Sequence, residues 1–106
     1  MLINVSKLPS EGKDVIQIIG RFDFNERHNF KEAYSPFLEK SSESIIEINM
    51  AGVNYLDSSS LGMLMLLSEK AQLLGKSLLI SHPNSLVSQI IDISNIAKIS
   101  NIAIKL

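Results

Sequence analysis

The stretch Tyr55–Gly62 (YLDSSSLG) places one acid and three hydroxyl side chains directly before the apolar run MLMLL. Aspartate and serine are favoured where a helix begins, because their side-chain oxygens accept hydrogen bonds from free backbone N–H groups. Asp57 is therefore predicted to cap a helix from Ser58 to Leu74, and Gly75 marks the end of that helix. A cap of this kind is worth on the order of 1 kcal/mol, so the cluster has a structural interpretation.

The predicted helix has two stripes at helical spacing. We expect one stripe to face the core, and it consists of Ser60, Leu64, Leu67, Ala71 and Leu74. The opposite stripe consists of Gly62, Met65, Glu69, Gln72 and Lys76. Met65 is then an apolar side chain on a polar face, close to Leu61. It indicates either contact with a partner protein or simple packing at the edge of the helix.

Two strands are predicted before this segment. Val15–Phe22 (VIQIIGRF) is rich in β-branched side chains, and Leu2–Val5 is a shorter apolar run. Turn-forming residues at Ser10–Asp14 lie between them, which predicts a hairpin.

A first helix should follow, with Asn25 as its cap. Its apolar face consists of Phe30, Ala33, Tyr34, Phe37 and Leu38. Pro36 interrupts this pattern and predicts a kink or two shorter helical pieces, because proline removes a backbone donor.

The remaining elements continue the alternation of strand and helix. Ser44–Met50 (SIIEINM) predicts a buried central strand, and Ser77–Ser81 (SLLIS) predicts another. Pro83 and Asn84 begin a last helix. Its predicted core stripe is Leu86, Ile90, Ile93 and Ala97, widened by Val87 and Ile91. Asn101–Leu106 predicts an edge strand.

The order β-β-α-β-α-β-α-β is typical of helices packed on a mostly parallel sheet with right-handed crossovers. The fold class is therefore α/β, with an antiparallel hairpin making the sheet mixed. A chain of 106 residues is long enough for one core and too short for two, so residues 1–106 are expected to form a single domain.

Composition and charge argue against several functions. Ten basic and eleven acidic residues give a net charge of -1, and the basic residues are scattered. Nucleic-acid binding needs a concentrated basic face and anionic membranes need a polybasic run, so neither is expected. The absence of cysteine excludes Cys-ligated metal sites. No signal peptide is visible, and no apolar run approaches the roughly 20 residues of a membrane span, so a cytoplasmic protein is expected.

The hydroxyls at the predicted helix start are also suited to modification. A phosphate on Ser58 or Ser59 would lie in the positive field of the helix N-terminus, so the fold could carry it. The added charge would lie beside Leu61 and Met65, where a partner's acidic or desolvated groups would reject it. This would be a switch made by local electrostatics, although the same residues also fit a passive cap.

The motif resembles a family signature. Val53–Gly62 (VNYLDSSSLG) is similar to the Asp-Ser-Ser-Gly-Leu-Gly motif of the STAS domain (sulphate transporter and anti-sigma factor antagonist), in its stand-alone bacterial anti-sigma factor antagonist form. Gly20–Asp23 (GRFD) resembles the family's Gly-x-Leu-Asp, and the element order matches over essentially all 106 residues. The resemblance implies the STAS fold, a mixed sheet with helices largely covering one face.

The resemblance also implies a function as a partner switch. Unphosphorylated stand-alone members bind an anti-sigma factor of the serine-kinase ATPase type. Phosphorylation by that kinase breaks the complex, and a metal-dependent phosphatase of the PP2C-like class restores it. This chain would then be the substrate rather than an enzyme, with no cofactor or metal of its own.

The resemblance also assigns residues. The phosphorylated serine maps to Ser59, with Ser58 as the alternative. The other residues that map to the motif and support the site are Asp57, Ser58, Ser60 and Gly62. We expect the partner-binding surface to consist of Asp23, Ser59, Leu61 and Met65.

Two departures from the family pattern concern glycine. Ser60 stands where the family has its first motif glycine, and it adds a third hydroxyl. Asn95, within Ser94–Ile96, stands where the family has Ser-Gly-Leu. Asparagine also tolerates the left-handed conformation, so we expect the local turn to survive.

The sequence also bears on functions other than the switch. His28 and His82 lie in no catalytic motif, so an enzyme is not favoured. Within the family, some STAS domains are cytoplasmic accessory subunits of membrane transporters, including lipid-transport ABC systems, and that alternative stays open. A switch could also act on another output, such as a response regulator phosphatase or a nucleotide-signalling enzyme.

Overall fold

The computed structural model describes residues 4–10 and 12–105, in which five strands form one sheet of order β1-β2-β3-β4-β5. The strands are β1 (Asn4–Ser10), β2 (Lys13–Phe22), β3 (Ile45–Leu56), β4 (Ser77–Ser81) and β5 (Ala103–Lys105). β1 runs antiparallel to β2, whereas β2 to β5 run parallel. The predicted α/β fold with a mixed, mostly parallel sheet is confirmed.

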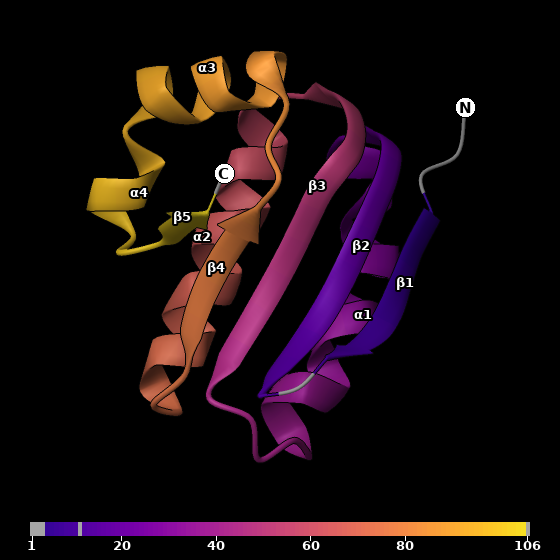
Figure 1. The fold of residues 1–106 in the computed structure, drawn as a ribbon, viewed down its shortest axis with the longest axis vertical. Helices are drawn as coiled ribbons and strands as arrows, with labels where there is room; N and C mark the ends of the chain where they lie inside the picture. The colour runs from indigo at the N-terminus through magenta and orange to yellow at the C-terminus, as the bar shows by residue number, and fades with distance from the viewer. Residues whose placement is uncertain (1–3, 11, 106) are drawn as a thin grey trace.

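The helices connect neighbouring parallel strands. They are the 3₁₀-helix η1 (Phe24–Glu26) and the α-helices α1 (Arg27–Glu39), α2 (Ser58–Leu73), α3 (Ser85–Ser94) and α4 (Ile96–Ile99). Each crossover steps in the same direction along the sheet, so crossovers of one hand place their helices on one face. Figure 1 shows α1 and α2 together behind the sheet and α3 across the carboxyl end of β3.

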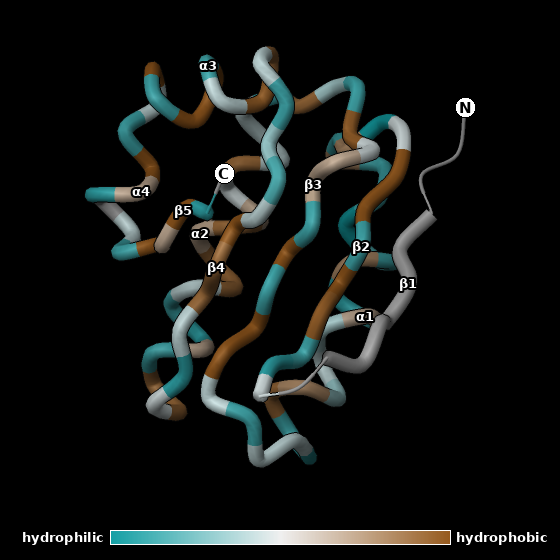
Figure 2. Tube along the Cα trace, viewed as in Figure 1, coloured by the Kyte–Doolittle hydropathy of each residue, from teal (hydrophilic) through white to brown (hydrophobic). Residues whose placement is uncertain are grey.

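The core lies between the sheet and these helices. Alternate residues of β2, β3 and β4 face it, as the alternating hydropathy along β2 and β3 in Figure 2 indicates. The fully buried residues include Ile16, Ile18, Ile46, Ile48, Met50, Ile80, Leu64, Leu67 and Ala71. Phe30 of α1 links β2 to this core, because its ring packs 5.1 Å from that of Phe22 and 5.3 Å from that of Tyr34.

The hairpin is confirmed, but its first strand is longer than predicted. β1 continues to Ser10, and its residues 4–10 pair with residues 13–19 of β2. Leu2 and Ile3 lie outside the described residues. Pro9 is tolerated within β1 because β1 is an edge strand. Gly12, with φ 77°, makes the turn.

The first helix is confirmed, with two corrections. Asn25 is not its cap: η1 precedes α1, and the carboxylate of Asp23 accepts the Asn25 backbone N–H at 3.0 Å. The prediction of two helical pieces is also wrong, because α1 runs continuously through Pro36. Pro36 lies in the last turn, where the Lys40 backbone N–H donates to its carbonyl at 2.9 Å.

The second helix has the predicted start and end. Gly75 adopts φ 74°, its N–H donates to the Gln72 carbonyl, and the Lys76 N–H donates to the Ala71 carbonyl. This is the paired bonding that closes helices ending in glycine. Leu74 is exposed rather than part of the core stripe. Lys76 is buried, and its Nζ donates to the backbone carbonyls of Ser41 and Glu43 in the loop between α1 and β3.

The third helix begins as predicted but faces the core with a different stripe. Asn84 caps it by accepting the Val87 backbone N–H at 2.9 Å. Val87 and Ile91 are buried, whereas Ile93, placed in the predicted core stripe, is 86% exposed. Asn95 adopts φ 61°, as its tolerance of the left-handed region allows, and separates α3 from α4. β5 supplies the predicted edge strand.

Candidate functional site

Two acidic residues end neighbouring parallel strands at the same edge of the sheet. Phe22 of β2 pairs with Leu56 of β3, so Asp23 and Asp57 both follow directly after this paired position. Both are extended, with φ -135° and -128°, and each accepts a backbone N–H from the helix that it precedes. Two helix starts therefore lie side by side at the carboxyl ends of β2 and β3.

The start of α2 is a capping box between Asp57 and Ser60. The Ser60 N–H donates to Asp57 Oδ1 at 3.0 Å, and the Asp57 N–H donates to Ser60 Oγ at 3.2 Å. The Ser60 hydroxyl in turn donates to the backbone carbonyl of Phe22, and the side chain is completely buried. Ser60 therefore joins α2 to the end of β2, a role that the glycine of the family motif could not perform.

The charge of Asp57 is stabilised by these contacts. Desolvation acts to raise the pKa of Asp57, but hydrogen bonds from the backbone N–H and the hydroxyl of Ser60 outweigh it and hold the pKa below its ordinary value. The carboxylate is thus ionised at neutral pH and serves as the helix cap.

Arg21 and Tyr55 link the two caps. Arg21 Nε donates to Asp23 Oδ2 at 2.7 Å, and its guanidinium carbon lies 3.6 Å from the centroid of the Tyr55 ring. The Tyr55 hydroxyl donates to Asp57 Oδ2 at a long 3.4 Å. The hydrogen bond to Asp23, and then the nearby Tyr55, Asp23 and Asp57, raise the pKa of Arg21 above its ordinary value.

Sequence reasoning assigned no role to Arg21 or Tyr55. Their positions in the sequence could have indicated a role. Each stands two residues before a cap, on strands whose alternation would place both side chains on one face of the sheet. Asp23, expected at the partner-binding surface, is instead buried. Both of its carboxylate oxygens have partners within the chain.

The three serines at the start of α2 differ in exposure. Ser58 and Ser59 are exposed in the first turn, whereas Ser60 is buried and hydrogen-bonded. A modifying enzyme could therefore reach the first two hydroxyls, but not that of Ser60 without opening the helix start.

The residues expected to form one partner-binding surface lie on two sides of α2. Ser59 shares a stripe with Met63 and Leu66, which line a groove against α1. Leu61 and Met65 stand seven residues before Ser68 and Gln72, whose side chains both bond to the Ser100 carbonyl after α4. Ser59 thus faces the α1 side, and Leu61 and Met65 face the α4 side.

Leu61 and Met65 are also less exposed than the sequence suggested. Both are half-buried and pack against the core. Leu66, one residue after Met65, is 48% exposed on the α1 side. Gly62 is exposed and has open space around it, so it leaves the surface beside Ser58 and Ser59 uncovered.

A partly buried charge pair lies away from these caps. Glu47 of β3 accepts from Lys13 Nζ at 2.6 Å and from the Ser81 hydroxyl at 2.7 Å. Desolvation acts to raise the pKa of Glu47, but these hydrogen bonds lower it overall. With both carboxylate oxygens bonded across three strands, Glu47 is best explained as a structural connection within the sheet.

Other chemistry has little support in the described parts of the chain. Among residues 4–10 and 12–105, no group of three His, Cys, Asp or Glu side chains could hold a metal ion. None of the described helices is long and apolar enough to cross a bilayer. His28 is exposed and lies 2.9 Å from Glu32 on the surface of α1, and His82 is exposed with φ 54° after β4.

Solved structures share this fold. A crystal structure of a candidate anti-sigma factor antagonist from Thermotoga maritima superposes with a TM-score of 0.83 at 19% identity, over 96% of this chain and 86% of that one. The phosphorylated form of SpoIIAA, a cell fate determinant of Bacillus, gives 0.68 at 13%, over 92% and 86%. The STAS domain of a SulP transporter from Vibrio cholerae gives 0.64 at 16%, over 93% and 77%.

Sequence comparison identifies the family. A STAS-domain-containing protein of Pseudomonas aeruginosa (strain UCBPP-PA14) is 34% identical over 101 residues, covering 93% of this chain and 98% of that protein. The family model described as "Mlab, STAS domain" matches residues 7–104. With the shared fold and the two capped helix starts, these matches show that the chain belongs to the STAS domain family.

Proposed function

We propose that this STAS protein is an anti-sigma factor antagonist switched by phosphorylation of Ser59. The observation that carries the proposal is the difference between Ser59 and Ser60. Ser60 is buried and holds the helix to β2, whereas Ser59 presents an exposed hydroxyl in the first turn of α2. A phosphate there would meet the positive end of the helix, so the fold can carry it.

The proposed partner is an anti-sigma factor or serine kinase of the ATPase type. The unphosphorylated chain would bind and sequester it, phosphorylation of Ser59 would release it, and a PP2C-like phosphatase would restore binding. Support comes from the anti-sigma factor antagonists that share the fold, among them SpoIIAA, which has been solved in both an unphosphorylated and a phosphorylated form. In this scheme the chain acts in the cytoplasm as a substrate without a cofactor of its own, and the partner supplies ATP.

The proposed docking surface is revised by the geometry of α2. Ser59 and the α1 side of α2 form its centre, and Asp23 positions α1 beside it rather than contacting the partner directly. Leu61 and Met65, on the other side of the helix, would contact only a partner that also covers the start of α2.

The experiment is affinity capture from a lysate of the source organism, with the chain as bait. Wild type and Ser59→Ala should recover the same kinase-type partner, whereas Ser59→Asp should lose it. Ser58→Asp is the matched control, because it adds the same charge one residue away on the α4 side of α2. Circular dichroism checks that all four proteins are folded. Equal recovery by all four would refute the switch, and loss with Ser58→Asp alone would move the modified residue to Ser58.

A second candidate function has a specific observation in its favour. The transporter STAS domain from Vibrio cholerae shares the fold over most of this chain. An accessory subunit of a membrane transporter, such as a lipid-type ABC system, is therefore the alternative. Recovery of membrane ATPase subunits by both wild type and Ser59→Asp would favour it over the switch.

A further inference from the structure

A groove of about 460 Å³ lies between α1 and α2 on the side of α2 that carries Ser59. We call it the α1–α2 groove. Its apolar lining consists of Phe30, Tyr34, Met63 and Leu66. Its remaining lining residues are all basic, namely Arg27, His28 and Lys31.

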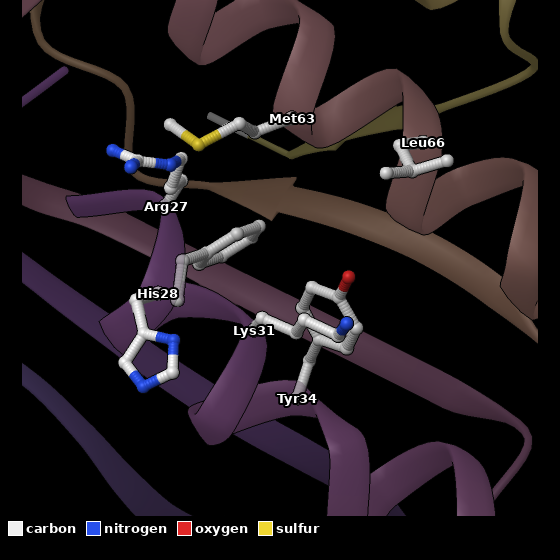
Figure 3. Close-up of a pocket in the computed structure, with 7 residues that line it drawn as sticks. Arg27, His28, Lys31, Tyr34, Met63 and Leu66 are labelled. Carbon is white, nitrogen blue, oxygen red and sulfur yellow. The ribbon is translucent and has the colours of Figure 1, made fainter. Parts of the chain in front are cut away.

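The apolar part of the groove offers anchoring surface from both helices. Phe30 and Tyr34 are buried in edge-to-face contact, which fixes the wall that α1 contributes. Met63 is half-buried and Leu66 is 48% exposed, so α2 supplies two apolar side chains that this chain leaves partly uncovered. Figure 3 shows the Met63 thioether near Arg27 and the Tyr34 hydroxyl directed toward Leu66. Methionine adapts to the shape of a partner, which suits a docking site.

Positive charge surrounds this apolar surface. Arg27 and Lys31 stand one helical turn apart on α1, so their backbones are separated by about 6 Å along the helix. Lys70 of α2 lies beside the groove rather than in its lining, with its Nζ 5.7 Å from the centroid of the Tyr34 ring. His28 already faces Glu32, and among the residues that the structure describes no acid lines the groove itself. The whole chain has a net charge of -1, so this concentration of cations is local.

We propose that the α1–α2 groove binds an acidic amphipathic helix of the partner protein. Apolar side chains of that helix, spaced at three and four residues, would pack on Met63 and Leu66. Its flanking carboxylates would meet Arg27, Lys31 and Lys70. A protein helix fits better than a fatty acid, because the cations are spread along α1 and include Lys70 of α2 beside the groove, whereas a fatty acid has a single anionic head.

This assignment rests on the proposed function and gives the switch its mechanism. Ser59, Met63 and Leu66 recur at four and three residues, so a phosphate on Ser59 would lie at one end of the groove. There it would repel the carboxylates of the bound helix and compete for Arg27. The partner would then be released without any movement of α2.

The test uses two synthetic helical peptides of about 15 residues, identical in a leucine face and differing in a polar face of glutamate or lysine. Binding is measured by fluorescence anisotropy, and the contact is located by NMR of the Met63 methyl group. The acidic peptide should bind and shift the Met63 signal, and the basic peptide should not. Lys31→Glu should weaken binding about tenfold, whereas Lys98→Glu on α4 should leave it unchanged.

Several results would overturn the assignment. They are no binding of the acidic peptide at millimolar concentration, equal binding of both peptides, or equal effects of Lys31→Glu and Lys98→Glu. Oleate is included as a third probe. If it shifts the Met63 signal and the acidic peptide does not, the occupant is an amphipathic lipid rather than a protein helix.

Ser59→Asp separates this assignment from the proposed function. If it leaves both peptide binding and capture of the kinase-type partner intact, while Lys31→Glu weakens peptide binding, the groove binds acidic helices but the Ser59 switch fails. If Ser59→Asp abolishes capture of the kinase-type partner, while Lys31→Glu changes neither capture nor peptide binding, the switch stands and the groove assignment fails.

Discussion

The two helix starts at the carboxyl ends of β2 and β3 have nearly the same backbone and very different surfaces. Asp23 and Asp57 are both extended caps at matching positions. After Asp23 comes Phe24, which is 54% exposed and is covered on one side by the Arg27 guanidinium 4.3 Å from its ring. After Asp57 come the exposed hydroxyls of Ser58 and Ser59. The comparison shows that the scaffold provides two equivalent cap positions, and that the side chains after the cap place exposed hydroxyls at only one of them.

The two starts also differ in how they are held. Asp23 is held by Arg21, an exposed side chain, whereas the α2 start is joined to β2 by the buried hydroxyl of Ser60. The predictions below test this difference.

The largest effect is expected from Ser60→Ala. It removes the donor to the Phe22 carbonyl and the acceptor of the Asp57 N–H in a buried place, so the free energy of unfolding should fall by about 2 kcal/mol. Urea unfolding measures it. Ser59→Ala is the matched control and should change stability by less than about 0.5 kcal/mol. Equal losses for the two serines would contradict the structural role of Ser60.

The second-largest loss of stability is expected when the cap of a helix is removed. Asp57→Ala should lower the free energy of unfolding by about 1 to 1.5 kcal/mol, and Asp23→Ala should cost a similar amount, because each removes the acceptor of one helix start. Asp57→Asn and Asp23→Asn should recover most of the loss, since asparagine also caps. Thermal unfolding of the four variants is the measurement, and an Asn variant no better than its Ala counterpart would show that capping is not the cause.

A smaller effect is expected from Arg21→Ala. Its hydrogen bond and ring contact lie at the surface, where such contacts contribute little, so the loss should be less than that of either cap. The loss should nearly vanish in an Asp23→Ala background, because the main partner of Arg21 is then already absent. If Arg21→Ala causes the same loss of stability in the Asp23→Ala background, the contribution of Arg21 comes from its contact with the Tyr55 ring instead.

The smallest effect is on pH dependence. The folded pKa of Asp57 is depressed, so its stabilising contribution is fully present above the ordinary value of 3.8 and is lost as pH falls through the lower folded pKa. The stability difference between wild type and Asp57→Asn should therefore be constant near neutral pH and shrink below about pH 4. Urea unfolding across this range tests the prediction. A difference that grows on acidification would mean that the pKa is raised instead.

The fold could largely be predicted because alternating strands and helices leave few topologies. The predictions that proved wrong concern the bounds and caps of elements, which depend on neighbours in space. Pro9 and Ser10 are residue types typical of a turn, but in the structure they pair with the antiparallel strand β2. Asn25 resembles a cap as much as Asp23 does, and only the short η1 decides between them.

The helix cap of the candidate site could be predicted from the sequence, but the arrangement of the side chains around it could not. Asp57 was identified from cap chemistry alone, and its role is confirmed by the geometry. The side of α2 that lies beside α1 could not be predicted, because helical spacing groups Leu61 with Met65 and Ser59 with Met63 without saying which group lines the groove. That depends on where α1 packs. For the same reason Val87 and Ile91, rather than Ile93, proved to be the buried residues of α3.

Under the proposed switch, the bond from Ser60 to Phe22 has a consequence for how a partner would distinguish the phosphorylated protein from the unphosphorylated one. With the first turn of α2 tied to a buried strand, the modified and unmodified proteins should have almost the same shape and differ mainly in electrostatic potential. A partner would then recognise charge rather than conformation, and dissolved ions screen charge. The concentration of salt in the cell would therefore help to set how completely one phosphate separates the bound state from the free state.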